Sequence, residues 1–248
     1  MNYKKYLNVC RESVINEDMF NKFKQHPDYR SILEHVSYEQ GLLYLDEINK
    51  DNPELLRILP KFVQNDSIGN PLVYYYSQLD CVISPTTLRY IKVLSDLRKT
   101  FGDLQGMNIV EIGVGYGGQC KIISDLFKFK SYTLIDLPDP CELAKKCLNK
   151  YKVSNVNIWN GELNYYDLCI SNYAFTEISR NYQEIYKQQF IDRSDRGYIT
   201  CNFLDQRSSK IALTKKEIFS MKDDFTVLPE QPLTAAHNMI YLWNINHK

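Results

Sequence analysis

The sequence predicts an α/β protein with a doubly wound, mostly parallel sheet. After Gly102, short apolar runs alternate with segments of helical periodicity, and a glycine-rich string follows the first apolar run. Strands that alternate with helices favour a parallel sheet with covered faces. About eight residues separate the last two apolar runs, too few for a helical crossover, so we expect the last strand to pair antiparallel.

Residues 102–248 carry this alternation and are predicted to form a Rossmann-like domain. Continuous or alternating apolar runs predict the strands, and apolar residues at helical spacing predict the helices. The expected strands are 107–113, 131–136, 156–159, 167–172, 197–204, 225–229 and 238–245. The expected helices are 117–128, 139–151, 181–191 and 214–222.

Residues 1–101 predict a helical N-terminal region with a lid loop. Helical periodicity runs over residues 12–64, and two proline-containing turns divide it into roughly three helices. Glycine and proline signals predict an irregular loop at 65–85, and Ser84-Pro85 then begins a helix that ends near Lys99. The region is expected to serve as a substrate lid or as the interface of a homodimer.

Composition and charge exclude several classes of partner. Thirty basic residues balance thirty acidic ones, so no overall field favours nucleic acid or a membrane surface. Acidic residues interrupt the start of the chain, and no apolar run approaches the length of a membrane span. The seven cysteines lack the C-x-x-C spacing of a metal or redox site. We expect a cytoplasmic protein without nucleic acid, membrane insertion or bound metal.

A glycine-rich turn is the strongest chemical signal. Residues 111–118 read Glu-Ile-Gly-Val-Gly-Tyr-Gly-Gly, where the first predicted strand ends and a helix begins. Glycines allow a tight turn and let backbone N–H groups approach a ligand. Asp136 ends the next strand, 23 residues after Gly113, which suits an acid that accepts hydrogen bonds from both ribose hydroxyls. The sequence therefore predicts a nucleotide-type site.

The same string satisfies G-x-G-x-x-G, so a nicotinamide dehydrogenase is an alternative. Two features favour S-adenosyl-L-methionine (AdoMet) instead. Glu111 resembles the acid that opens the E-x-G-x-G-x-G motif of methyltransferases, where it helps to fix the loop and the methionine end of the cofactor. A dinucleotide also carries a pyrophosphate, which gains nothing from a nearby carboxylate.

Longer strings resemble the sugar O-methyltransferases found in bacterial surface-polysaccharide gene clusters and in some large viruses. They are VEIGVGYGGQ, LIDLPDP, ISNYAFTEISR, RGYITCNFL, ISPTTLRYIKVLSDL, LPEQPLT and the IYLW near the end. The resemblance begins near residue 26 and covers most of the chain. It implies AdoMet-dependent transfer of a methyl group to a sugar hydroxyl, within a nucleotide-sugar or a glycan, in polysaccharide biosynthesis.

Because ligands bind at the carboxyl ends of parallel strands, the residues that follow the predicted strands are the expected cofactor site. The expected cofactor residues are Glu111, Gly113, Gly115, Tyr116, Gly117, Gln119, Asp136, Leu137, Asn160, Gly161, Glu162, Ser171 and Asn172. Asn172 is expected to hold the amino group of the methionine moiety.

A sugar hydroxyl must lose its proton during methyl transfer, so a base is expected. Glu177 and His237 are the candidates; the alternatives are that Glu177 caps a helix or pairs with Arg180, and that His237 has no chemical role. Four residues are expected to bind the acceptor: Tyr173, Arg89, Tyr76 and Asn202. Asn202 and Asp205 are candidates for sugar hydroxyls or, alternatively, for a metal, although one Asp without a second acid nearby is poor evidence for a metal. Packing and surface roles are the alternatives for Tyr76 and Arg89. A methyltransferase for another small molecule and an AdoMet-binding module without catalysis share every one of the cofactor features.

Overall fold

The computed structural model describes residues 3–203 and 210–245 and divides the chain into two compact units. The helical unit comprises Met1–Gly102, Val114–Phe127 and Asp136–Ser154. The sheet unit comprises Asp103–Gly113, Lys128–Ile135 and Asn155–Lys248. The predicted region 1–101 therefore shares its unit with two segments that the sequence pattern assigned to the second domain.

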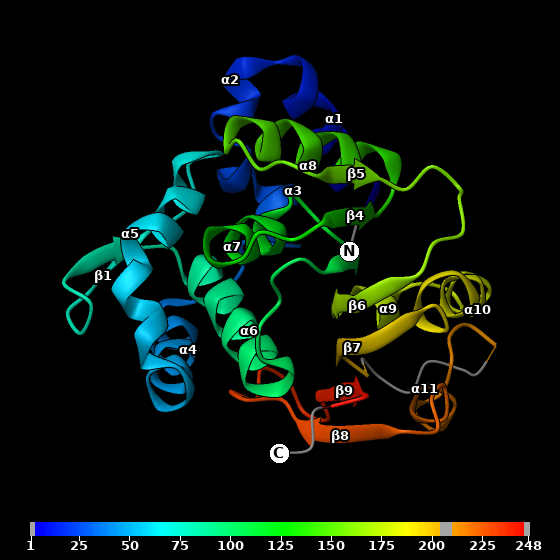
Figure 1. The fold of residues 1–248 in the computed structure, drawn as a ribbon. Helices are drawn as coiled ribbons and strands as arrows, with labels where there is room; N and C mark the ends of the chain where they lie inside the picture. Colours follow the sequence, from blue (N-terminus) through cyan, green and yellow to red (C-terminus); the bar gives the residue numbers. More distant parts are fainter. Residues whose placement is uncertain (1–2, 204–209, 246–248) are drawn as a thin grey trace. The chain divides into compact units, whose positions relative to one another are not determined.

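The sheet unit is built on a mostly parallel sheet (Figure 1). Its strands are β3 (Asn108–Ile112), β4 (Ser131–Ile135), β5 (Val156–Ile158), β6 (Tyr166–Asn172), β7 (Ser194–Cys201), β8 (Phe225–Pro229) and β9 (Met239–Trp243). Within the described residues the strand order is β5-β4-β3-β6-β7-β9-β8. Neighbours from β5 to β7 pair parallel, while β9 pairs antiparallel with both β7 and β8. The predicted fold class and the antiparallel pairing of the last strand are confirmed.

The core of the sheet unit lies between the strands and four short helical segments. These are α9 (Ala174–Glu177), α10 (Arg180–Tyr186), η4 (Lys187–Ile191) and α11 (Lys215–Phe219). Their apolar side chains pack with those of the strands in one buried cluster that includes Val110, Phe175, Phe190, Ile199 and Trp243. A β-carbon on Gly197 of β7 would lie 1.8 Å from Trp243, so only glycine fits under this ring.

Strand β7 begins three residues before the predicted strand. Asp195 and Arg196 lie within it, although their polar side chains carry no strand signal. The strand runs between β6 and β9 and is hydrogen-bonded to both, so backbone pairing holds these polar residues in the extended conformation. Leu204, the predicted end of this strand, lies outside the described residues.

The helical unit is more fragmented than predicted. It comprises α1 (Tyr3–Ile15), α2 (Glu17–Phe20), η1 (Phe23–Gln25), α3 (Pro27–Arg30), α4 (Tyr38–Asp51), η2 (Pro53–Ile58), α5 (Leu59–Phe62), η3 (Val63–Ser67), β1 (Tyr74–Tyr76), β2 (Cys81–Ile83), α6 (Pro85–Phe101), α7 (Gly118–Leu126) and α8 (Pro138–Lys150). The hairpin β1–β2 occupies part of the segment predicted as an irregular loop. Ser84 caps α6 as predicted, because its side chain accepts the N–H of Thr87.

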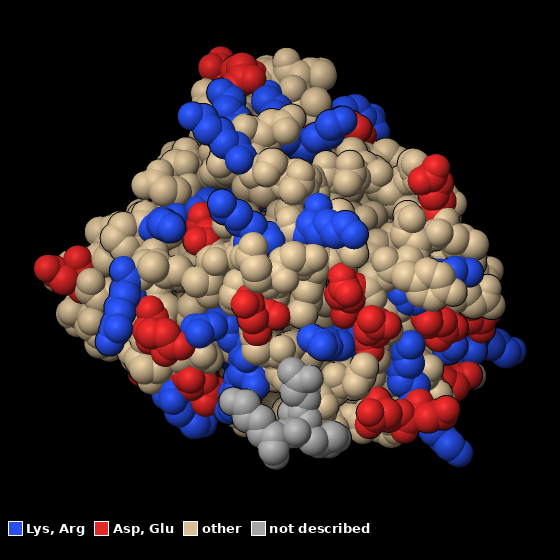
Figure 2. Space-filling view, viewed as in Figure 1, with Lys and Arg blue, Asp and Glu red and all other residues tan. Residues whose placement is uncertain are grey.

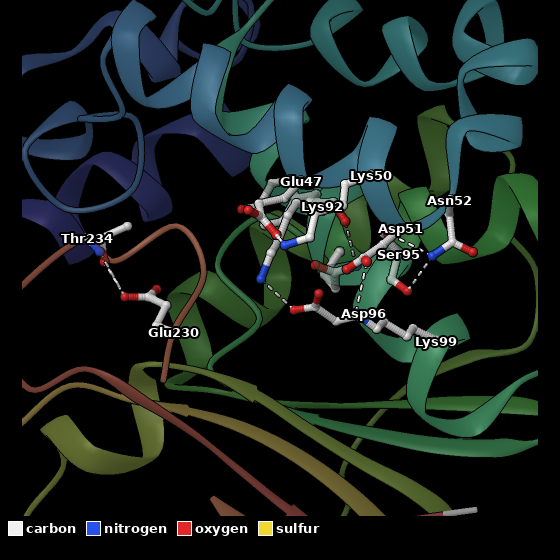
Figure 3. A network of polar contacts seen from close by, with 12 residues as sticks. Glu47, Lys50, Asp51, Asn52, Lys92, Ser95, Asp96, Lys99, Glu230 and Thr234 are labelled. Carbon is white, nitrogen blue, oxygen red and sulfur yellow. Dashed lines mark hydrogen bonds and ion pairs between the residues drawn. The ribbon is translucent and has the colours of Figure 1, made fainter. Parts of the chain in front are cut away.

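Polar contacts tie the helices of this unit together. Helix α1 packs along α8, and Arg11 pairs with Asp139 at 2.8 Å. Helix α4 packs along α6, where Asn52 donates to Ser95 Oγ at 2.8 Å and Lys99 pairs with Asp51 at 2.8 Å (Figure 3). Pairs such as Lys99–Asp51 are largely exposed and contribute little to stability, whereas the buried Asn52 contact fixes how the two helices pack.

The surface carries both signs of charge. On the face drawn in Figure 2, Lys and Arg side chains lie interspersed with Asp and Glu. Six of the seven cysteines are buried, where they pack as small apolar side chains. Over the part of the chain that the structure describes, no helix combines the length and the apolar character that a membrane span requires.

Candidate active site

The first glycine of the predicted cofactor turn is required by its surroundings in the sheet unit. Gly113 follows β3 directly, has φ +82°, and donates its N–H to the carbonyl of Ile135 at 2.7 Å. A β-carbon at this position would lie 2.0 Å from the β-carbon of Ala174. Both the left-handed backbone and the close approach therefore exclude other residues.

The later glycines lie in the helical unit and are held in the same way. Gly115 and Gly117 have φ +55° and φ +83°. Side chains there would meet Leu33 at 2.7 Å and Leu148 at 2.9 Å. Helix α7 starts at Gly118, directly after this turn. The N–H of Gly115 is bonded to Asp136 Oδ2, and that of Gly117 to the carbonyl of Val114 at 2.8 Å. The glycines thus set the shape of the turn beside Asp136.

Asp136 is hydrogen-bonded to the same turn within the helical unit. Its Oδ2 accepts the N–H of Gly115 at 3.1 Å, and its Oδ1 accepts the N–H of Leu137 at 2.7 Å. Burial raises the pKa of this carboxyl to about 6, although the N–H groups of Leu137, Gly115 and Val114 act in the opposite direction. Burial raises the pKa of the Cys10 thiol in α1, and the nearby charge of Asp136 raises it further. A carboxylate is thus positioned beside the glycine turn and under α1.

The side chains of Tyr116 and Gln119 are fully buried in the helical unit. The Tyr116 ring is fully buried, and Lys24 Nζ lies 3.9 Å from its centre. Its hydroxyl accepts a hydrogen bond from Asn65 Nδ2 at 2.9 Å, and Gln119 donates to the carbonyl of Tyr90 at 3.2 Å. Both side chains are packed within the helical unit, and their contact with a cofactor stays a prediction.

Replacing Asn65 by alanine is expected to lower the free energy of unfolding by about 2 to 3 kcal/mol. Its amide donates to Thr87 Oγ1 at 2.8 Å and to Tyr116 in the buried interior, and each lost hydrogen bond of this kind costs about 1 to 1.5 kcal/mol. Urea unfolding measures the change. The exposed Asn149 of the same unit provides the control; equal losses for Asn65→Ala and Asn149→Ala would contradict this role.

Two predicted cofactor residues of the sheet unit join neighbouring strands. Glu111 is almost fully buried in β3, and its Oε2 accepts the hydroxyl of Tyr132 at 2.7 Å. Ser171 Oγ donates to the carbonyl of Ile112 at 2.9 Å and accepts the N–H of Phe175 at 3.1 Å. Both contacts hold the end of β3 in place and so position Gly113, which follows it.

The residues after β6 and β7 form a polar rim on the sheet unit. The exposed Glu177 accepts a hydrogen bond from Asn202 Nδ2 at 2.5 Å. Asn172 Oδ1 is buried, and among the described residues no group donates a hydrogen bond to it. A buried acceptor without a donor is costly, so Asn172 is suited to a ligand that brings an N–H group.

Sequence reasoning missed Glu230, which belongs to this rim. It follows β8, is 4% exposed, and bonds through Oε1 to the hydroxyl of Tyr173. Its Oε2 accepts the N–H and the hydroxyl of Thr234, the latter at 2.7 Å and drawn in Figure 3. The only sequence signal was its place in the LPEQPLT string, because the Tyr173 partner lies 57 residues earlier.

The remaining predicted residues have open or packed positions. Met239 at the start of β9 pairs with Cys201 at the end of β7. The start of β9 therefore lies at the same edge of the sheet as the end of β7. His237 precedes β9 at this edge, as predicted, and is exposed. Asn160, Gly161 and Glu162 form an exposed turn in which Asn160 Oδ1 accepts the N–H of Glu162 at 3.1 Å. That these three residues contact the adenine ring remains a prediction.

The helical unit holds the other two predicted acceptor residues. Tyr76 is fully buried and packs on Tyr38 with ring centres 4.9 Å apart, which favours the packing role. Arg89 donates to the carbonyl of Leu33 at 3.3 Å. Across residues 3–203 and 210–245, no three His, Cys, Asp or Glu side chains gather as a metal-binding group, and Asp205 lies outside these ranges.

Comparison with known proteins finds methyltransferases over part of the chain, and no family model matches. The protein-L-isoaspartate O-methyltransferase of Pyrococcus abyssi is 34% identical over 58 residues, 23% of this chain and 27% of the relative. That of Pyrococcus horikoshii is 24% identical over 110 residues, 44% and 46% of the two chains. The chain thus spans less than half the length of these curated relatives.

One solved structure with a bound ligand is similar in outline. The magnesium protoporphyrin IX methyltransferase of Synechocystis PCC 6803, solved with bound SAM, shares 10% identity, covers 64% of this chain and 76% of its own, and gives a TM-score of 0.46. This score is too low to carry an argument about function. All three of these proteins are named as methyltransferases.

Proposed function

We propose that this chain is an AdoMet-dependent O-methyltransferase that acts on a sugar hydroxyl, in a nucleotide-sugar or a glycan. The observation that carries the proposal is the bond between the Asp136 carboxyl and the N–H of Gly115 beside the left-handed glycines. A carboxylate at this point accepts hydrogen bonds from the two ribose hydroxyls of a nucleoside. The partial similarity to methyltransferases and the resemblance to sugar O-methyltransferases support AdoMet as that nucleoside.

The residues present fit AdoMet. Three positions of the turn from Gly113 to Gly117 lack side chains, and a β-carbon at Gly113, Gly115 or Gly117 would collide with its neighbours. Within the sheet unit, Asn172 Oδ1 offers a buried acceptor that lacks a donor in the described part of the chain, which suits a ligand with an N–H group. Asp136 would hold the ribose, and Leu137 is the exposed apolar residue beside it.

When bound, AdoMet supplies a methyl group on a sulfonium that is already a strong electrophile. The protein must then hold the acceptor oxygen in line and remove its proton. Glu177 and His237 are candidate bases because both are exposed on the rim of the sheet unit. Asn202, which donates to Glu177, would orient that carboxylate or bind a second hydroxyl of the sugar.

Binding of S-adenosylhomocysteine (AdoHcy), the product, is expected to weaken as the pH falls through about 6. The raised pKa of Asp136, about 6, means that its carboxylate is protonated below this pH and accepts fewer hydrogen bonds from the ribose. The Kd should rise by about tenfold from pH 7 to pH 5. Titration calorimetry measures the profile. Asp136→Asn should bind weakly with a flat profile, whereas an unchanged slope in this variant would assign the pH dependence to another group.

The proposed reaction is tested by AdoHcy release. The protein is incubated with AdoMet and, separately, with UDP-glucose, UDP-galactose, GDP-mannose, dTDP-rhamnose and mixed oligosaccharides. Single-stranded RNA and DNA and a phenolic small molecule are the other acceptors. We expect turnover with a nucleotide-sugar or glycan that is lost in Asp136→Ala. Turnover with nucleic acid or the phenol alone would overturn the sugar assignment, and AdoHcy binding without any turnover would favour a module that binds AdoMet without catalysis.

A further inference from the structure

Tyr173 occupies a strained position directly after β6. Its φ is +68° although it is not glycine, and its N–H donates to the carbonyl of Thr200 at 2.9 Å. Residues other than glycine rarely adopt this backbone conformation. Strain of this kind persists where the surroundings enforce it, and it gathers at functional sites. The fold therefore fixes the direction of the Tyr173 side chain at the carboxyl end of a central strand.

The Tyr173 hydroxyl is bonded to a buried carboxylate that neutral donors hold in place. Glu230 Oε1 bonds to the phenol, while its Oε2 accepts the N–H of Thr234 at 3.1 Å, its hydroxyl at 2.7 Å, and Asn238 Nδ2 at 2.9 Å. These partners come from the segment between β8 and β9. Both oxygens of Glu230 are thus fixed, and the phenol is the one partner with an acidic proton among them.

The pair connects the buried interior with the rim. Glu230 is 4% exposed, whereas Tyr173 is partly exposed. Tyr173 directly follows Asn172, whose buried Oδ1 is suited to the cofactor. The phenol is bonded to the Glu230 carboxylate, and its ring is partly exposed at the rim, where an acceptor hydroxyl would approach it. That arrangement suits proton transfer, since a relay needs an acceptor for each proton that moves.

We infer that Tyr173, in place of Glu177 or His237, is the residue that deprotonates the acceptor and that Glu230 positions it and takes its proton; the inference rests on the proposed function. As the acceptor oxygen forms its bond to the methyl carbon, its proton passes to Tyr173 Oη. The phenolic proton passes to Glu230 Oε1 at the same time, so Tyr173 stays neutral. The methyl donor leaves as a neutral thioether, and Glu230 later returns the proton to water.

The relay is tested first without cofactor. The protein is labelled with ¹³C at the Cζ of every tyrosine. The one resonance that is missing from the spectrum of Tyr173→Phe is thereby assigned to Tyr173. A phenol bonded to a carboxylate has a shifted Cζ resonance, so Glu230→Gln should move this signal toward the position of a free phenol. An unmoved signal would overturn the inference, because Glu230 would then not be the partner of the phenol.

Kinetics with the nucleotide-sugars named above complete the test. Tyr173→Phe and Glu230→Gln should each lower kcat by about 100- to 1,000-fold, with the acceptor KM and the AdoHcy Kd within about twofold of wild type. Tyr165→Phe, at a tyrosine that is 77% exposed in the same unit, is the matched control and should retain kcat.

The outcomes separate this inference from the proposed function. A wild type that does not bind AdoHcy would refute the proposed function itself. Turnover that survives Tyr173→Phe would overturn the relay alone. A variant that loses AdoHcy affinity and kcat together would show a structural role and overturn the relay as well. AdoHcy binding without turnover on any nucleotide-sugar or oligosaccharide would also overturn it, since it is inferred for a sugar hydroxyl.

Discussion

Asp136→Ala is expected to weaken AdoHcy binding by about 100-fold or more. The variant loses the charged acceptor for two ribose hydroxyls, and hydrogen bonds to charged groups contribute about 1.5 to 3 kcal/mol each. It also removes the partner of the Gly115 and Leu137 N–H groups, so the glycine turn loses a support. Titration calorimetry at pH 7.5 measures the Kd, at a pH where Asp136 is ionised.

A neighbouring aspartate provides the control for this prediction. Asp139 lies in the same unit and pairs with Arg11 at 2.8 Å. Asp139→Ala should leave the AdoHcy Kd within about twofold, because an exposed ion pair contributes little. Equal losses in the two variants would mean that general damage to the helical unit, rather than a lost ribose contact, explains the effect.

Gly113→Ala is expected to destabilise the protein by about 2 to 5 kcal/mol. The new β-carbon would lie 2.0 Å from that of Ala174, and overpacking of this kind costs about 1 to 3 kcal/mol. The left-handed backbone, φ +82°, adds about 1 to 2 kcal/mol for any residue with a side chain. Urea unfolding followed by circular dichroism measures the loss.

Gly161 separates the two causes. Its φ is +95°, yet nothing lies within 4 Å of the β-carbon that alanine would add. Gly161→Ala should therefore cost only about 1 kcal/mol, from the backbone alone. The double variant Gly113→Ala/Ala174→Gly should regain part of the stability lost in Gly113→Ala. A double variant no more stable than Gly113→Ala would contradict the steric account.

Local patterns were enough to predict most of the sheet. Apolar runs bounded by glycine or polar residues identified β3, β4, β6 and β8 to within two residues at either end, because each run is apolar and turn or polar residues mark its boundaries. The antiparallel pairing of β8 and β9 followed from the length of their connection. The same local patterns identified Gly113 and Asp136 as candidate cofactor residues, because each directly follows a predicted strand.

Features that depend on distant contacts could not be predicted in this way. Glu230 is a functional candidate because of Tyr173, and Tyr116 is a packing residue because of Asn65 and Lys24, all far apart in sequence. Tyrosine suits a ligand surface and a core equally well, since its ring is apolar and its hydroxyl is polar. Its role is decided by the residues that surround it, which a single sequence does not display.

The most direct test of the central claim is calorimetric titration of the wild-type protein with AdoHcy and, separately, with NAD. The account predicts micromolar binding of AdoHcy and no detectable binding of NAD. Binding of NAD with none of AdoHcy would contradict the assignment of the glycine turn and Asp136 to AdoMet, and would identify the site as one for a dinucleotide.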